Sequence, residues 1–339
     1  MKTNLKLSLT ILSLGIGAVA RADLNIVTTT ADLASIAQSV GGAKVRVSSI
    51  VTGARDPHRI EAKPSFMSRA RSADLWLAIG LELEIGYERP ILDGSGNGKI
   101  RVGGPGHVYV SQWARVRDVP SGAVTRAQGD IHPFGNPHIW LDPYNGRSIA
   151  LRLGEKMGAL DPGNAATYKS NAAAFARKLD EAMFGEALVG KFGGDTLWGW
   201  DDGDKLVSNL RDKGALDQLG GWAAKMRPFW GKPIVTYHRS WNYFAYRFGL
   251  KIVAELEPKP GLEPTPGHIA GVIKTVEAQG VKVLLQEPYY SKRSAEFVAS
   301  RTSASAVVAP GSVGHESAAR DYITLIDAIV SRVSAAMAK

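Results

Sequence analysis

The most informative absence in this chain is cysteine, of which its 339 residues contain none. Disulfide bonds and thiolate metal ligands are therefore excluded, and so is lipid attachment through an N-terminal cysteine. A metal ion bound to this protein would have to be held without thiolates.

Clustered positive charge is also missing, although the formal net charge is +9. Lysines and arginines are scattered singly between acidic residues. A nucleic-acid-binding surface would need a stripe of basic residues with aromatic residues among them. The composition therefore disfavours nucleic acid as a partner, and we interpret the excess charge as ordinary surface chemistry.

Only one stretch is apolar enough to suggest a membrane, and it lies at the N-terminus. Leu7 to Ala20 follows Lys2 and Lys6, and it ends in Ala20-Arg21-Ala22. A basic segment, a short apolar core and an Ala-Xaa-Ala end are typical of a secretory signal peptide, and the core is short for a membrane span. We predict a signal peptide over 1–22, cleaved near Ala22, and a soluble mature protein in a bacterial periplasm.

Three of the seven histidines occur in distinctive short motifs. The motifs are Asp56-Pro57-His58, Asn136-Pro137-His138-Ile139-Trp140-Leu141-Asp142-Pro143 and Val235-Thr236-Tyr237-His238. Each histidine lies beside a proline or at the end of a β-branched run, where α/β folds present ligand-binding groups. Imidazole is a common zinc ligand, and three imidazoles can hold one ion.

The pattern of apolar residues predicts an α/β fold. Expected strands cover 24–28, 45–51, 75–79, 233–237, 252–255 and 281–285, and expected helices cover 31–40, 64–70, 161–185, 204–219 and 318–336. Strands alternating with helices favour parallel sheets, and 339 residues favour two lobes. We predict two Rossmann-like lobes joined by one long rigid helix.

This reading gives provisional domain boundaries. An N-terminal lobe covers 23–160, a linking helix covers 161–185, and a C-terminal lobe covers 186–339. The linking helix is expected to start at Asp161-Pro162, because an aspartate before proline is a good helix start. Residues 186–230 are rich in glycine and tryptophan, and we predict an insertion packed on the C-terminal lobe with its tryptophans buried.

Taken together, these motifs resemble those of the metal-binding solute receptors of bacterial ABC importers for zinc and manganese. The similarity extends to Glu263-Pro264-Thr265-Pro266 and Gln286-Glu287-Pro288, and it covers most of the mature chain outside 186–230. The resemblance implies two lobes bridged by a long helix, with one ion held between them by His58, His138 and His238. It also implies a membrane permease and an ATPase as partners, and we expect a monomer. Three nitrogen ligands favour zinc over manganese.

The sequence departs from this family at the fourth ligand. Relatives place an aspartate in a turn that here reads Val308-Ala309-Pro310-Gly311-Ser312-Val313-Gly314, which contains no acid. We predict that Glu287 takes its place, with a purely structural role for Glu287 as an equal alternative. His315 and water are further candidates. The remaining histidines, His107, His132 and His268, are predicted to lie at the surface.

Two other functions are compatible with parts of the pattern. Three histidines with an open position also describe a hydrolytic zinc site, in which Glu61 or Glu287 could act as base. A chelate or haem receptor on the same architecture would not need the histidines as a set. Because no general base and nucleophile form a convincing pair, we predict a binding protein and not an enzyme.

Overall fold

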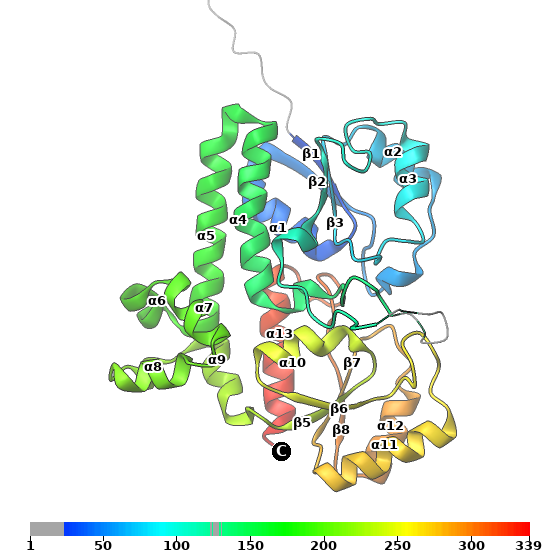
Figure 1. Ribbon diagram of the computed structural model, residues 1–339, viewed down its shortest axis with the longest axis vertical. Helices are drawn as coiled ribbons and strands as arrows, with labels where there is room; N and C mark the ends of the chain where they lie inside the picture. Colours follow the sequence, from blue (N-terminus) through cyan, green and yellow to red (C-terminus); the bar gives the residue numbers. More distant parts are fainter. Residues whose placement is uncertain (1–23, 123, 125–128, 130) are drawn as a thin grey trace, which may run out of the picture.

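The computed structural model describes residues 24–122, 124, 129 and 131–339. The predicted signal peptide, 1–22, lies outside these residues. The described chain begins with the strand that follows it. Figure 1 shows two sheet-containing lobes, with long helices running beside the upper lobe and down to the lower one. In the described part of the chain, no helix combines the length and apolar character needed to cross a bilayer.

The N-terminal lobe is built on a parallel sheet in the order β2-β1-β3-β4. Its elements are β1 (Leu24–Thr28), α1 (Ala31–Gly41), β2 (Val45–Ser49), α2 (Pro64–Arg71), β3 (Leu75–Ala78), α3 (Glu88–Ser95) and β4 (His107–Tyr109). Every residue of β3 is buried, as is usual for a strand in a parallel sheet covered on both faces.

The C-terminal lobe repeats this arrangement, with a parallel sheet in the order β6-β5-β7-β8. Its elements are β5 (Pro233–Thr236), α10 (Asn242–Arg247), β6 (Lys251–Glu255), α11 (Pro266–Gln279), β7 (Val283–Gln286), α12 (Arg293–Arg301), β8 (Ser305–Val308) and α13 (Tyr322–Met337). The predicted α/β fold with two parallel sheets is confirmed.

A pair of long helices, α4 (Pro143–Leu160) and α5 (Ala165–Phe184), packs side by side along the molecule. Their close approach depends on Gly154, where an added Cβ would lie 2.8 Å from the Cβ of Ala172. The helix α5 begins later than expected. Asp161 does not cap it; its carboxylate instead accepts hydrogen bonds from Asn164 and from the Tyr168 hydroxyl.

The segment 186–230 forms α6 (Glu186–Phe192), α7 (Gly194–Asp202), α8 (Leu206–Asp212) and α9 (Gly221–Met226). The expected single helix over 204–219 is therefore wrong, because the chain turns at Lys213 and Gly214. These helices contact α5 more than the C-terminal sheet, and α9 also contacts α13. The domain boundaries themselves remain a prediction.

The tryptophans of this segment divide into two groups. Trp198 and Trp222 are buried, as expected, and Trp198 donates a hydrogen bond to Asp180 of α5. Trp200 is only half-buried, and Trp230 is 55% exposed. The prediction that all four are buried therefore fails for Trp230.

Buried polar contacts join the two lobes. The Arg247 guanidinium of α10 binds both carboxylate oxygens of Asp142, which caps α4, at 2.8 and 2.9 Å. Asp32 of α1 accepts hydrogen bonds from the Ser312 hydroxyl and the Val313 amide, which lie between β8 and α13. Separation of the lobes would have to break these contacts.

Candidate metal centre

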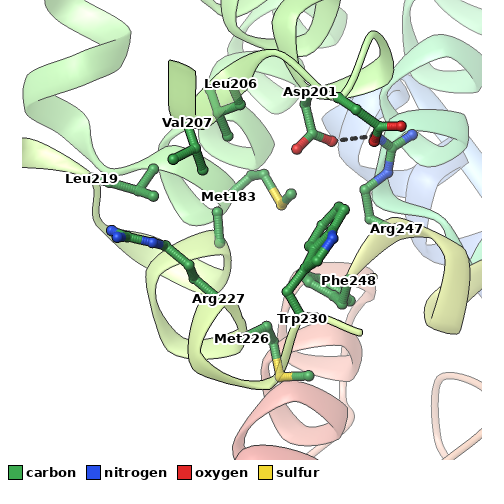
Figure 2. Close-up of a pocket in the computed structure, with 12 residues that line it drawn as sticks. Met183, Asp201, Leu206, Val207, Leu219, Met226, Arg227, Trp230, Arg247 and Phe248 are labelled. Carbon is green, nitrogen blue, oxygen red and sulfur yellow. Dashed lines mark hydrogen bonds and ion pairs between the residues drawn. The ribbon is translucent and has the colours of Figure 1, made fainter. Parts of the chain in front are cut away.

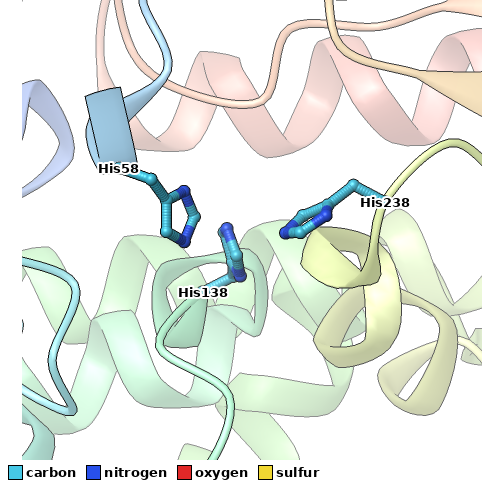
Figure 3. Close-up of side chains that lie close together, drawn as sticks. All are labelled: His58, His138 and His238. Atoms are coloured by element: carbon cyan, nitrogen blue, oxygen red, sulfur yellow. The ribbon is translucent and has the colours of Figure 1, made fainter. Parts of the chain in front are cut away.

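The three motif histidines come from three separate loops that follow strands. His58 lies in the 3₁₀ turn Pro57–Arg59 beyond β2, and His138 directly precedes the 3₁₀ turn Ile139–Leu141 that leads into α4. His238 follows β5 of the C-terminal lobe. Figure 3 shows the three imidazoles converging from these different segments.

The three rings form a compact cluster between the lobes. Their potential ligand atoms all lie within 4.8 Å of one another. The ring centroids are 5.1 Å apart for His58 and His138, 5.4 Å for His138 and His238, and 5.6 Å for His58 and His238. Loops that are far apart in the sequence thus present three nitrogens to one point.

In the N-terminal lobe, each histidine is oriented by the residue two positions before it. The Asp56 carboxylate accepts a hydrogen bond from the His58 amide at 2.9 Å, and the same oxygen lies 2.9 Å from His58 Nδ1. The Asn136 side chain does the same for His138, at 3.1 Å from the amide and 2.8 Å from Nδ1. An acceptor at Nδ1 fixes the proton there and leaves Nε2 as the metal-binding atom.

The C-terminal lobe orients its histidine through a more distant residue. Glu257, which follows β6, places its carboxylate 2.7 Å from His238 Nδ1, and both side chains are buried. Among the described residues, Nε2 of His58 and Nε2 of His138 are buried without a hydrogen-bond partner. Buried nitrogens of this kind need a partner, and a shared metal ion would supply it.

Burial and neighbouring charges separate the pKa values within the site. Burial lowers the pKa of His138 well below its ordinary value, and the nearby histidines lower it further. Burial also opposes a charge on His238, but the hydrogen bond and charge of Glu257 outweigh it and raise the pKa of His238. For Asp56, the interaction with His58 outweighs burial, and the pKa of the carboxyl is lowered. His138 is thus neutral and ready to bind a metal at neutral pH.

The sequence matches the family model described as zinc-uptake complex component A, periplasmic, over residues 26–183 and 213–336. The chain belongs to this zinc-uptake family. The match passes over residues 184–212, so helices α6, α7 and α8 are features outside the family model. The resemblance inferred from the motifs is confirmed, and the family's role is metal binding for transport.

Relatives of this chain carry names that refer to different metals. The high-affinity zinc uptake protein ZnuA of Brucella abortus is 26% identical over 49% of this chain, and the match spans only 39% of that relative's length. The metal ABC transporter substrate-binding lipoprotein FimA of Streptococcus parasanguinis is 26% identical, covering 86% of this chain and 81% of its own. The iron-binding protein YfeA of Yersinia pestis is 24% identical, with 91% and 85% covered.

Solved structures of similar shape support the fold. A crystal structure of ZnuA superposes with a TM-score of 0.64 at 20% identity, covering 92% of this chain and 98% of that one. A manganese-bound periplasmic metal-binding protein of Candidatus Liberibacter asiaticus gives the same TM-score, identity and coverage. At this level of identity the likeness concerns the fold alone.

Glu287 lies at the end of β7, on the C-terminal side of the site. Its carboxylate accepts a short hydrogen bond from the Ser240 hydroxyl, while Oε2 is buried and forms no hydrogen bond with a described residue. Burial raises the pKa of Glu287 to about 7, although Ser240 and the charge of His238 oppose the shift. The side chain also packs against Gly311, where an added Cβ would lie 2.8 Å from its Cγ.

His315 is turned toward its own loop. Its Nδ1 accepts a hydrogen bond from the Gly311 amide at 3.2 Å, and its ring packs edge-on against Tyr289. Burial lowers the pKa of His315 to about 4. The turn at 308–314 is therefore tied back on itself and, through Asp32, to the N-terminal lobe.

The three histidines predicted to lie at the surface do not all do so. His132 is half-buried with its ring 5.3 Å from that of His58, so this prediction is wrong and His132 lies beside the cluster. The His107 side chain is buried, 3.1 Å from Glu88. His268 is half-buried, with Nε2 2.9 Å from the Glu255 carbonyl oxygen.

The orienting residues were only partly visible in the sequence. Asp56 and Asn136 stand in two copies of one pattern, an aspartate or asparagine followed by proline and histidine, and this repetition signals their shared role. Glu257 was missed. Its only local signal is its position just after a strand, a property it shares with many other residues.

Proposed function

We propose that this protein is a periplasmic receptor that captures a divalent transition-metal ion, zinc above all, between its two lobes. The proposal rests on one observation: three imidazoles from both lobes converge, each with its Nδ1 engaged by a separate acceptor. The ion would be bound through the three Nε2 atoms. It is the transported cargo.

Zinc is preferred over manganese because of the donor atoms. Three neutral imidazoles suit zinc, copper, nickel and iron, whereas manganese favours carboxylate, carbonyl and water oxygens. The iron-binding and manganese-bound relatives show that the architecture alone does not decide the metal. The donor set of this chain is the argument for zinc.

Glu287 is proposed as the fourth ligand. Its carboxylate is close enough to interact electrostatically with His238, and one of its oxygens is already held by Ser240. The other oxygen, Oε2, is available to approach the ion. In this role Glu287 would supply the negative charge that relatives obtain from the turn at 308–314, and water is the alternative ligand.

The same proposal covers the cellular context. The mature protein would be a soluble periplasmic monomer, freed from its signal peptide near Ala22, and it would pass its ion to a membrane permease driven by an ATPase. The lobes would cover 23–160 and 186–339, with the linking helix between them.

The first test is metal content and affinity. The mature protein would be purified from the periplasm, analysed by mass spectrometry for bound metals, and titrated with zinc and manganese in competition with a chelator. We expect one equivalent of zinc. Replacement of His58, His138 or His238 by alanine should each weaken zinc binding by roughly three orders of magnitude, because each removes one of three or four ligands.

His268→Gln provides the matched control, since His268 lies outside the cluster and glutamine can still donate to the Glu255 carbonyl. This variant should retain full zinc affinity. Glu287→Gln should weaken binding less than a histidine loss, because water can replace one oxygen. Unchanged affinity in all three histidine variants would refute the receptor proposal, whereas unchanged affinity in Glu287→Gln alone would remove only Glu287.

The comparisons give the hydrolase alternative no support. Glu61 is exposed, in a loop that lines a different hollow together with Arg55 and Lys63. Glu287 is held by Ser240. The same preparation would be assayed for metal-dependent ester and phosphoester hydrolysis, and turnover lost in His138→Ala would revive this alternative.

A further inference from the structure

A cavity lies where the added helices α7 and α8 meet α9 and the end of α10. Its volume is about 470 Å³, which is within the range of small-molecule sites. Since the family model passes over residues 184–212, one wall of this cavity is made by a segment outside that model. Figure 2 shows its lining.

Most of the lining is apolar and adaptable. Met183, Leu206, Met226 and Phe248 form the inner surface. Methionine side chains are flexible and polarizable, so a pair of them can adjust to different apolar shapes. The body of a ligand in this cavity should therefore be apolar.

Trp230 is the distinctive residue of the cavity. It is 55% exposed, and Figure 2 shows its indole directed into the space. One side of the ring packs against Gly249, where any Cβ would collide with the indole and where φ is +65°. The Gly231 amide donates a hydrogen bond to the Gly249 carbonyl at 2.6 Å and fixes this contact. The indole is thus held in place with aromatic surface left uncovered.

Negative charge is concentrated at one end of the cavity. Asp201 and Asp204 both line it, and Asp201 shares the Arg247 guanidinium with Asp142 and Asp202. Burial raises the pKa of Asp201, and the charges of Asp142 and Asp204 raise it further against the attraction of Arg247. Arg115 also pairs with Asp202, so four carboxylates (Asp142, Asp201, Asp202 and Asp204) face two guanidinium groups at this end.

We propose that this cavity binds an amphipathic organic cation, with its aromatic or apolar body on Trp230 and its positive end at Asp201 and Asp204. A cation next to an aromatic face and carboxylates gains from both. Arg227 lines the opposite wall and would orient such a ligand by repelling its positive end. The site is separate from the histidine cluster, so it does not depend on the metal-binding proposal.

The test uses three ligands that share an indole ring and differ in charge: tryptamine, indole-3-acetamide and indole-3-acetate. Binding to the mature, metal-loaded protein would be measured by isothermal titration calorimetry and ligand-observed NMR. We expect tryptamine to bind about tenfold more tightly than indole-3-acetate, with the amide in between.

Three variants locate the binding. Trp230→Ala should weaken all three ligands by about tenfold, because it removes the stacking surface. Asp204→Asn, at an exposed position, should weaken tryptamine about threefold and leave the amide unchanged. Phe297→Ala is the matched control, since Phe297 is a similarly exposed aromatic residue on α12 and its loss should change nothing.

The proposal is overturned if none of the three ligands binds, if indole-3-acetate binds best, or if Trp230→Ala binds like the parent protein. Thermal melting and zinc content of each variant would verify that it is folded. Because zinc content is measured for each variant, a loss of ligand binding at this cavity can be distinguished from a loss of metal binding at the histidine cluster.

Discussion

In the N-terminal lobe, the group that orients each histidine lies two residues before it in the same loop, whereas in the C-terminal lobe it lies nineteen residues away, after another strand. Asp56 and Asn136 also bind the backbone amide of their histidine, so ring and loop are ordered together. Glu257 binds the ring of His238, and the same carboxylate oxygen accepts a hydrogen bond from the Gly261 amide. One half of the site is ordered locally, and the other half requires the folded sheet.

Among the residues that orient the histidines, the largest effect should come from breaking the long-range contact. Glu257→Ala removes a buried, charged acceptor from His238, and loss of such a partner weakens metal binding by about 100-fold at the upper end of the usual range. Competitive zinc titration would measure it. If Glu257→Ala weakened zinc binding less than Asn136→Ala does, this would contradict our inference that the charged, distant acceptor contributes more than the neutral, local one.

A smaller effect is expected at the neutral acceptor of the N-terminal lobe. Asn136→Ala removes the hydrogen bonds that orient His138, and it should weaken zinc binding by about tenfold. Asn136 also donates to the Arg239 carbonyl across the lobes, so some loss of stability should accompany it. Asn136→Asp retains the acceptor for His138 but turns a carboxylate oxygen toward Asp118 and the Arg239 carbonyl, so it should recover only part of the affinity in the same titration.

Asp56→Asn separates geometry from charge. Asparagine can still accept from the His58 amide and from Nδ1, as Asn136 does in the matching loop, but it carries no charge. We expect zinc affinity to fall only about threefold, toward the weak end of such effects. A loss as large as that in Asp56→Ala would mean that charge, and not orientation, is the contribution of Asp56.

Asp32 should affect stability in a pH-dependent way. Burial raises the pKa of Asp32 from 3.8 to about 6, so ionisation is less favourable in the folded protein than in the unfolded chain. The wild type should therefore be most stable relative to Asp32→Asn below pH 4 and lose up to about 3 kcal/mol of that advantage as pH rises through 6. Urea unfolding of both proteins at pH 4.5 and 8 would measure this change. A pH-independent difference would refute it.

The sequence was sufficient for features that are encoded locally. Six of the eight described strands are short apolar runs, and the face of α5 formed by Tyr168, Phe175, Leu179 and Met183 repeats at helical spacing, so these were predictable. The edge strands β4 and β8 were missed. The three ligand histidines were predictable for the same reason, since each lies in its own motif.

Features that depend on folding were not predictable. The nearness of Glu257 to His238 follows from the pairing of β5 with β6, and the position of His132 beside His58 follows from the path of a long loop. The added helix α7 is held to α5 by the hydrogen bond from Trp198 to Asp180, and to α4 by the bond from Arg147 to Asp195. Nothing near residues 186–230 in the sequence identifies those partners.

The buried ion pair between Arg247 and Asp142 also bears on how long cargo stays bound. Opening of the lobes would separate Arg247 from Asp142 but leave Arg247 paired with Asp201 and Asp202 of α7. The time for which an ion stays bound would then depend on this remote contact as well as on the ligands of the ion.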